Sequence, residues 1–229
     1  MKNRKGLSSI TKKLIMAITG GCLVFFLLFH GSMNVVSIIS ESGYNWICEF
    51  LGANWYAVVG TIGLAAMVVI HFIYAFILSF QNYRARGNQR YAVTERQDGV
   101  SWASKNMLVI GIIVILGLGL HLYDFWAKMQ LAELQGAAPS DGLSPVDGTG
   151  RIKMVFGDTY FSIMYILWLA FLWFHLSHGI ASVMQSIGWS NHVWKRRIEW
   201  LGKFFAIVIV AMFASVVLYY WLIFPNLNV

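Results

Sequence analysis

The stretch NMLVIGIIVILGLGLHLYDFW at residues 106–126 decides the fold, because it is almost wholly apolar and contains one histidine and one carboxylate. A helix rises about 1.5 Å per residue, so about 20 apolar residues cross a hydrocarbon core about 30 Å thick. Four further stretches of this kind lie at 14–39, 57–80, 157–186 and 203–224. The sequence therefore predicts an all-α polytopic membrane protein, a single transmembrane domain over residues 1–229 built as a bundle of five helices.

The composition agrees with this class. Hydrophobic residues make up 58% of the 229 residues and charged residues only 12%, which is too apolar for an ordinary soluble domain. The longest connection, 127–156, is rich in Gly, Pro, Ser and Asp, which predicts an exposed loop. The sequence has no C-x-x-C-H motif, and Cys22 and Cys48 lack the spacing of a zinc or iron–sulfur site. Covalently attached haem and iron–sulfur clusters are therefore excluded.

The distribution of charge predicts the orientation of the bundle. Basic residues gather in the N-terminal arm and in two of the connections: Lys2, Arg4, Lys5, Lys12 and Lys13; Arg84, Arg86, Arg90, Arg96 and Lys105; and Lys195, Arg196, Arg197 and Lys203. The other side carries most of the carboxylates: Glu41, Glu49, Glu133, Asp141, Asp147 and Asp158. The positive-inside rule then places the N-terminus in the cytoplasm and the C-terminus outside. Topology accounts for most of the net charge of +7, so the partner is a lipid bilayer and no nucleic acid is required.

Four of the apolar stretches each contain a histidine: His30, His71, His121 and His178. An ionisable side chain inside a membrane is costly and marks a candidate functional site. Counted from the flanking charges, His30 and His121 share the outer half of the bilayer, and His71 and His178 share the inner half. Two bis-histidine haems at two depths would require this arrangement. His175 is an alternative to His178, and a hydrogen bond across a helix interface is the alternative role for any one of them.

The segments around these histidines resemble a known family. They are LFHGSMN (28–34), HFIYAFILSFQNYRARGNQRY (71–91), LGLHLYDFWAKMQLAEL (118–134) and WFHLSHGIASVMQSIGW (173–189). Together they are similar to the single-chain, five-helix, dihaem cytochrome b subunit of bacterial succinate dehydrogenase/fumarate reductase. The resemblance implies that His30 and His121 bind the iron of an outer haem b, and that His71 and His178 bind the iron of an inner one. The H-G pair at 178–179 favours His178 over His175.

The resemblance also implies a function. The chain would be the membrane anchor and electron-transfer subunit of a succinate:quinone oxidoreductase in the bacterial cytoplasmic (inner) membrane. Its partners would be a flavoprotein subunit and an iron–sulfur subunit on the cytoplasmic face, and its substrate a quinone, with menaquinone expected. The enzyme complex would react with quinone on this chain, whereas the dicarboxylate chemistry would take place on a partner. Glu49 is the candidate for proton transfer at the quinone, and Asp124 is a weaker alternative.

Two other functions remain open from the sequence. One is the cytochrome b anchor of a hydrogenase or formate dehydrogenase, which would face its catalytic partner on the outer side. The other is a haem-free small transporter in which intramembrane histidines relay protons or bind substrate. The cytoplasmic basic segments argue against the first, and the lack of an internal repeat argues against the second.

Overall fold

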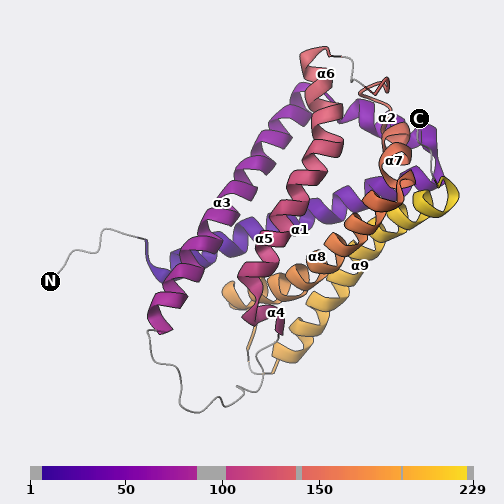
Figure 1. Cartoon of the computed structure of the whole chain (residues 1–229). Helices are drawn as coiled ribbons and strands as arrows, with labels where there is room; N and C mark the ends of the chain where they lie inside the picture. The colour runs from indigo at the N-terminus through magenta and orange to yellow at the C-terminus, as the bar shows by residue number, and fades with distance from the viewer. Residues whose placement is uncertain (1–6, 87–101, 138–140, 192, 226–229) are drawn as a thin grey trace.

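A computed structural model describes residues 7–86, 102–137, 141–191 and 193–225, and Figure 1 shows the arrangement of the helices. The described residues include five helices long and apolar enough to cross a membrane. They are α1 (Ser9–Ile39), α3 (Trp55–Arg86), the continuous segment Met107–Gln135, α8 (Thr159–Ser186) and α9 (Lys195–Ile223). The prediction of an all-α protein with five helices long and apolar enough to cross a membrane is confirmed.

The helices are longer than the apolar stretches that predicted them. The helix α1 begins at Ser9 rather than at 14, because the Ser8 side chain accepts a hydrogen bond from the Thr11 backbone and caps the helix. At the other end of the chain, α9 begins at Lys195 rather than at 203. Basic side chains in these first turns have long apolar stems and can extend to the membrane surface, so a helix continues where the apolar pattern stops.

The third span consists of three helical pieces in direct succession. The α-helix α5 (Met107–His121) is followed by the π-helix η1 (Leu122–Leu131) and by α6 (Ala132–Gln135). Gly136 ends the segment with a left-handed backbone, φ 61°, which glycine adopts without strain. The predicted boundary at 126 was therefore too early, because the polar residues that follow it remain helical.

The prediction of an exposed loop over 127–156 is wrong. Its second half forms α7 (Gly148–Gly157), in which Arg151 and Ile152 are each only 1% exposed. Asp147 caps this helix by accepting a hydrogen bond from the backbone of Gly150. Gly148 lets α7 approach the short helix α2 (Glu41–Phe50), since a Cβ at this position would collide with the side chains of Cys48 and Tyr44.

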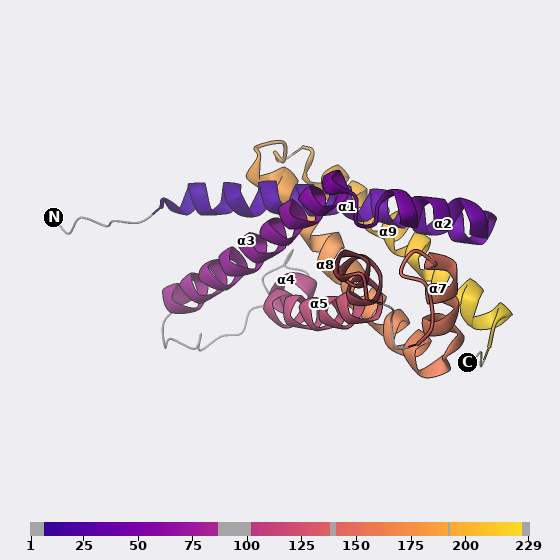
Figure 2. The ribbon, with the colours of Figure 1, turned by 90° about the horizontal axis from the view of Figure 1, so that it is seen from above.

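The helix α8 is central to the bundle, because it packs against α1, α5 and α9. Gly202 brings α9 close to α8, and a Cβ there would lie 3.3 Å from the backbone nitrogen of Ala181. By contrast, α3 packs mainly against α1, and no residue of its apolar window is buried. Figure 2 shows α3 diverging from α1 toward one end of the bundle.

The two ends of the bundle differ in the helices that form them (Figure 1) and in the charge of their sequences. The start of α1, the end of α3, the short helix α4 (Trp102–Lys105) and the start of α9 gather at one end, which we call the basic end. The helices α2, α6 and α7 gather at the other, which we call the acidic end. Lys2, Arg4, Lys5, Arg90 and Arg96, which entered the orientation argument, lie outside the described residues.

Candidate functional site

The first histidine pair lies in the half of the bundle toward the acidic end. His30 on α1 and His121, the last residue of α5, have ring centroids 5.8 Å apart and an interplanar angle of 72°. Both residues are half-buried, and among the described residues no hydrogen bond joins the two rings. The structure thus brings together the two histidines predicted to share the outer haem. We call them the acidic-end pair.

Aromatic side chains from four helices surround the acidic-end pair. Phe26 stacks on His30 with ring centroids 5.3 Å apart, and Phe213 of α9 approaches the same ring to 5.5 Å. On the other side, Phe125 and Trp168 lie 5.1 and 6.1 Å from the His121 ring. These rings surround the pair with apolar side chains.

The π-helix η1 begins directly after His121 and turns a carboxylate into the protein. Asp124 is only 7% exposed, and its Oδ2 accepts a hydrogen bond of 2.9 Å from the hydroxyl of Tyr165 on α8. The ring of Tyr165 in turn lies 6.4 Å from that of His121. Short π-helical segments occur frequently at functional sites. A hydrogen-bonded carboxylate and hydroxyl therefore stand beside the acidic-end pair.

The second pair consists of His71 on α3 and His175 on α8, with ring centroids 6.2 Å apart and an interplanar angle of 64°. We call them the basic-end pair. The sequence favoured His178 as the partner of His71, with His175 as the alternative, and the structure places His175 there. The two candidates lie three residues apart on α8, which separates their directions by about 60° around the helix.

A threonine on α1 determines which nitrogen of His71 carries the proton. Thr19 Oγ1 lies 2.9 Å from the carbonyl oxygen of Ile15 and 3.2 Å from Nδ1 of His71. Since the hydroxyl donates its hydrogen to the carbonyl, its oxygen accepts from Nδ1–H of the ring. The other ring nitrogen, Nε2, is then a free lone-pair donor. The neighbouring Gly20 permits this approach, because a Cβ there would lie 3.3 Å from Cε1 of His71.

The donor atoms and their spacing fit bis-histidine haem. Imidazole nitrogens bind metal ions at about 2 Å, so two rings on opposite sides of one ion have centres about 6 Å apart. The centroid distances of 5.8 and 6.2 Å agree with this value. Nδ1 of His175 is buried without a hydrogen-bond partner among the described residues, so this ring lacks the acceptor that His71 has in Thr19. Three or more His, Cys, Asp or Glu side chains converge nowhere in the described chain, but a bis-histidine haem needs only two.

The carboxylates of the acidic end are mostly engaged in structural contacts. Glu41 pairs with Lys153, Glu133 accepts from the backbone of Ala53, Asp141 pairs with Arg151 and Lys128, Asp147 accepts from Asn45, and Asp158 caps α8. The contact with Arg151 holds the pKa of the Asp141 carboxyl well below its usual range. Glu49 is exposed near the end of α2, and its carboxylate has no partner within the part of the chain that the structure describes.

Sequence reasoning missed three functional neighbours of the histidines, Thr19, Tyr165 and Gly20. Threonine and tyrosine are common in membrane helices, so only their contacts across helices distinguish them. The cysteines do not join either pair. Burial raises the pKa of Cys48 to about 11, which keeps its thiol protonated and makes it a poor metal ligand.

Comparisons with protein families, with curated proteins and with solved structures give no match for this chain.

Proposed function

We propose that this chain is the membrane anchor and electron-transfer subunit of a succinate:quinone oxidoreductase. One observation carries the proposal: two pairs of histidines, each drawn from two spanning helices, have the ring spacing of haem ligands. His30 and His121 would bind one haem b, and His71 and His175 the other. The resemblance of the sequence segments around these histidines to the dihaem cytochrome b family supplies the identity of the complex.

The positions of the two pairs support transfer across the bilayer. Thr19, which contacts His71, and His30 lie on the same helix, and their separation along α1 corresponds to about 16 Å. Bound haem supplies reversible one-electron chemistry at each level. The chain itself holds the two groups at fixed depths and surrounds the acidic-end pair with aromatic rings. Electrons could then pass between a quinone site at the acidic end and a partner at the basic end.

The proposed partners follow from charge and from the resemblance. An iron–sulfur subunit, with its flavoprotein subunit, would dock at the basic end, on the cytoplasmic side of a bacterial inner membrane. Quinone, with menaquinone as the expected form, would react at the acidic end. The N-terminus would then lie in the cytoplasm and the C-terminus outside, as the positive-inside rule predicts.

Asp124 is a better candidate than Glu49 for proton transfer at the quinone. Its carboxylate is buried and bonded to Tyr165, whose ring lies beside His121, whereas Glu49 is exposed at the end of α2. Asp124→Asn should lower quinone turnover by about 10²-fold or more, the range of a lost general acid or base. Glu49→Gln also removes one carboxylate and is the matched control. It should leave quinone turnover nearly unchanged. Equal losses in the two variants, or a larger loss in Glu49→Gln, would reject this assignment.

The first experiment is a haem count on the full chain purified from membranes. A reduced-minus-oxidised spectrum with a pyridine haemochrome assay should give two b-type haems per polypeptide. Protein that is helical by circular dichroism and elutes as a single species, but that contains no haem, would reject the proposal and favour the transporter alternative.

The identity of the complex needs a second measurement on native membranes. Succinate should reduce the haems of this chain, and fumarate should reoxidise them. Reduction by hydrogen or formate, without reduction by succinate, would instead assign the chain to the cytochrome b anchor of a hydrogenase or formate dehydrogenase.

A further inference from the structure

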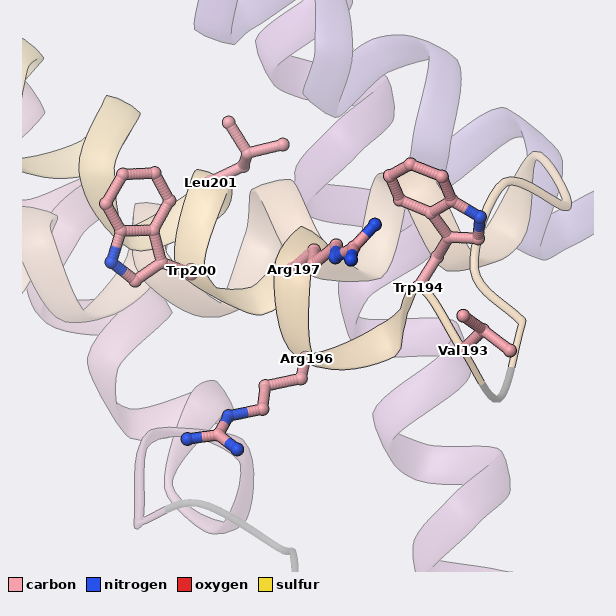
Figure 3. A pocket seen from close by; sticks show the side chains of 6 residues that line it. All are labelled: Val193, Trp194, Arg196, Arg197, Trp200 and Leu201. Carbon is pink, nitrogen blue, oxygen red and sulfur yellow. The ribbon is translucent and has the colours of Figure 1, made fainter.

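The outward side of the first two turns of α9 carries an open hollow of about 560 Å³. It is lined by Val193, Trp194, Arg196, Arg197, Trp200 and Leu201 (Figure 3). The two tryptophans are well exposed, Trp194 by 48% and Trp200 by 64%. No part of the haem proposal uses these residues, so the hollow requires an explanation of its own.

The two arginines supply uncompensated positive charge. Among the described residues neither guanidinium pairs with a carboxylate, although Glu199 lies on the same helix. Arg197 stands over the ring of Trp194, with its guanidinium carbon 4.8 Å from the ring centroid. Figure 3 shows Arg197 extending toward Trp194 and Arg196 extending away from the helix in a different direction. The hollow is therefore suited to an anion.

The position of the hollow on α9 indicates what kind of molecule reaches it. Ile198 and Gly202 are buried on the side that packs against α8, so the lining residues face away from the bundle. The outward side of a spanning helix faces lipid. Along the helix axis, the charged residues come first, and Trp200 and Leu201 follow one turn deeper. This order matches a phospholipid, whose phosphate lies above its acyl chains.

We propose that this hollow binds an anionic phospholipid, with its phosphate beside Arg197, the charge of Arg196 adding to the attraction, and an acyl chain along Trp200 and Leu201. Guanidinium groups bind phosphate oxygens through paired, charge-assisted hydrogen bonds. Tryptophan favours the level of the headgroups, where its ring is partly apolar and its N–H stays hydrated. Basic pockets beside spanning helices are a recognised site for acidic headgroups. The inference does not depend on the haems or on the partner subunits.

Native mass spectrometry of the full chain in detergent tests the proposal. The protein is titrated with phosphatidylglycerol and, separately, with phosphatidylethanolamine of the same acyl chains. Phosphatidylglycerol should bind more tightly, and Arg196→Gln with Arg197→Gln should weaken it about fivefold for each guanidinium removed, the equivalent of about 1 kcal/mol per charge. The affinity for phosphatidylethanolamine, which is zwitterionic, should fall much less in the same variant.

A matched control separates this site from the general charge of the basic end. Arg84→Gln with Lys105→Gln removes an equal number of positive charges from the basic end, near the end of α3 and at the end of α4. This control should change the affinity for phosphatidylglycerol less than twofold. Equal losses in the two double variants, or equal affinity for the two lipids, would overturn the assignment. If the first double variant fails to fold, Arg197→Gln alone gives the same comparison.

Discussion

The two histidine pairs have nearly the same geometry and very different surroundings. Their ring centroids are 5.8 and 6.2 Å apart, and each pair joins two spanning helices. Aromatic rings enclose the acidic-end pair, whereas a hydroxyl and a glycine of α1 lie against the basic-end pair. The spacing of the paired rings is thus set by helix packing, while the polar contacts of each imidazole are set by its non-histidine neighbours.

The contrast is clearest at the Nδ1 atoms. Thr19 presents an oxygen to Nδ1 of His71, but Asn34 presents its amide nitrogen to Nδ1 of His30 at 3.3 Å. The orientation of this amide is fixed, because its nitrogen donates to the His30 carbonyl at 2.8 Å and its oxygen accepts from Tyr44. An iron on Nε2 requires a proton on Nδ1. His71 at the basic end would thus have its Nδ1 proton in place for an iron on Nε2, whereas Asn34 would have to turn from the ring of His30.

The largest effect expected is the loss of one haem and not the other. His121→Ala should reduce the haem content from two to one per chain, because a bis-histidine haem does not persist on a single ligand. His71→Ala should cause the same loss, but with the opposite band missing from the low-temperature reduced spectrum. A pyridine haemochrome assay measures the count. Two haems retained in either variant, or both lost in folded protein, would contradict the separation into two pairs.

The basic-end pair can be tested further by a comparison within α8. His175→Ala should remove the basic-end haem, since His175 is the ring that faces His71. His178→Ala should retain both haems, and it serves as the matched control because it lies one turn away on the same helix. The opposite result would restore the pairing of His71 with His178 that the sequence favoured. Haem content and the reduced spectrum decide between the two.

Stability should depend most strongly on the acidic end. The side chain of Arg151 is 2% exposed and pairs with Asp141, and Phe156 of the same helix contacts Phe125 beside His121. Asp141→Asn leaves a buried guanidinium without its anion and should cost about 3 kcal/mol. Glu41→Gln, which breaks the more exposed pair with Lys153, should cost less than about 1 kcal/mol. Thermal midpoints measure both.

The pH dependence gives the same contact a second test. Because the pKa of Asp141 is lowered in the folded protein, its contribution is present above the ordinary aspartate pKa of about 3.9. This contribution to stability is lost as the pH falls through the pKa that Asp141 has in the folded protein. The difference in thermal midpoint between the wild type and Asp141→Asn should therefore shrink below about pH 4. A difference that stays constant would show that the ion pair is not its cause.

The sequence predicted the large features of this molecule because they depend on the bilayer. Five apolar stretches must be helical in lipid, where every backbone group needs a hydrogen bond within its own segment. The helix α7 was missed because glycines and two basic residues interrupt its apolar residues, and its contacts with α2, α8 and α9 bury it. The choice between His175 and His178 depended on a rotation of about 60° on α8, which the periodicity does not fix. Likewise, the contact of Thr19 with His71 depends on how α1 crosses α3.

The smallest effect expected is also the sharpest test of the contrast at Nδ1. Thr19→Val keeps the shape of the side chain but removes the oxygen that accepts from His71, which makes the imidazole a weaker donor. Oxidised iron depends more on a strong donor than reduced iron does, so the potential of the basic-end haem should rise. A hydrogen bond of about 1 kcal/mol corresponds to roughly 40 mV for one electron. Thr19→Ser should restore the original potential.

The acidic-end haem of the same molecules is the internal control in a redox titration. Its potential should stay within about 10 mV of the wild type in both variants, because its ligand His30 lies about 16 Å from Thr19 along α1. A rise in both haems would indicate a general loosening of the bundle. A rise in neither would show that the Thr19 oxygen does not act on the bound ligand, and the two pairs would then differ only in their packing.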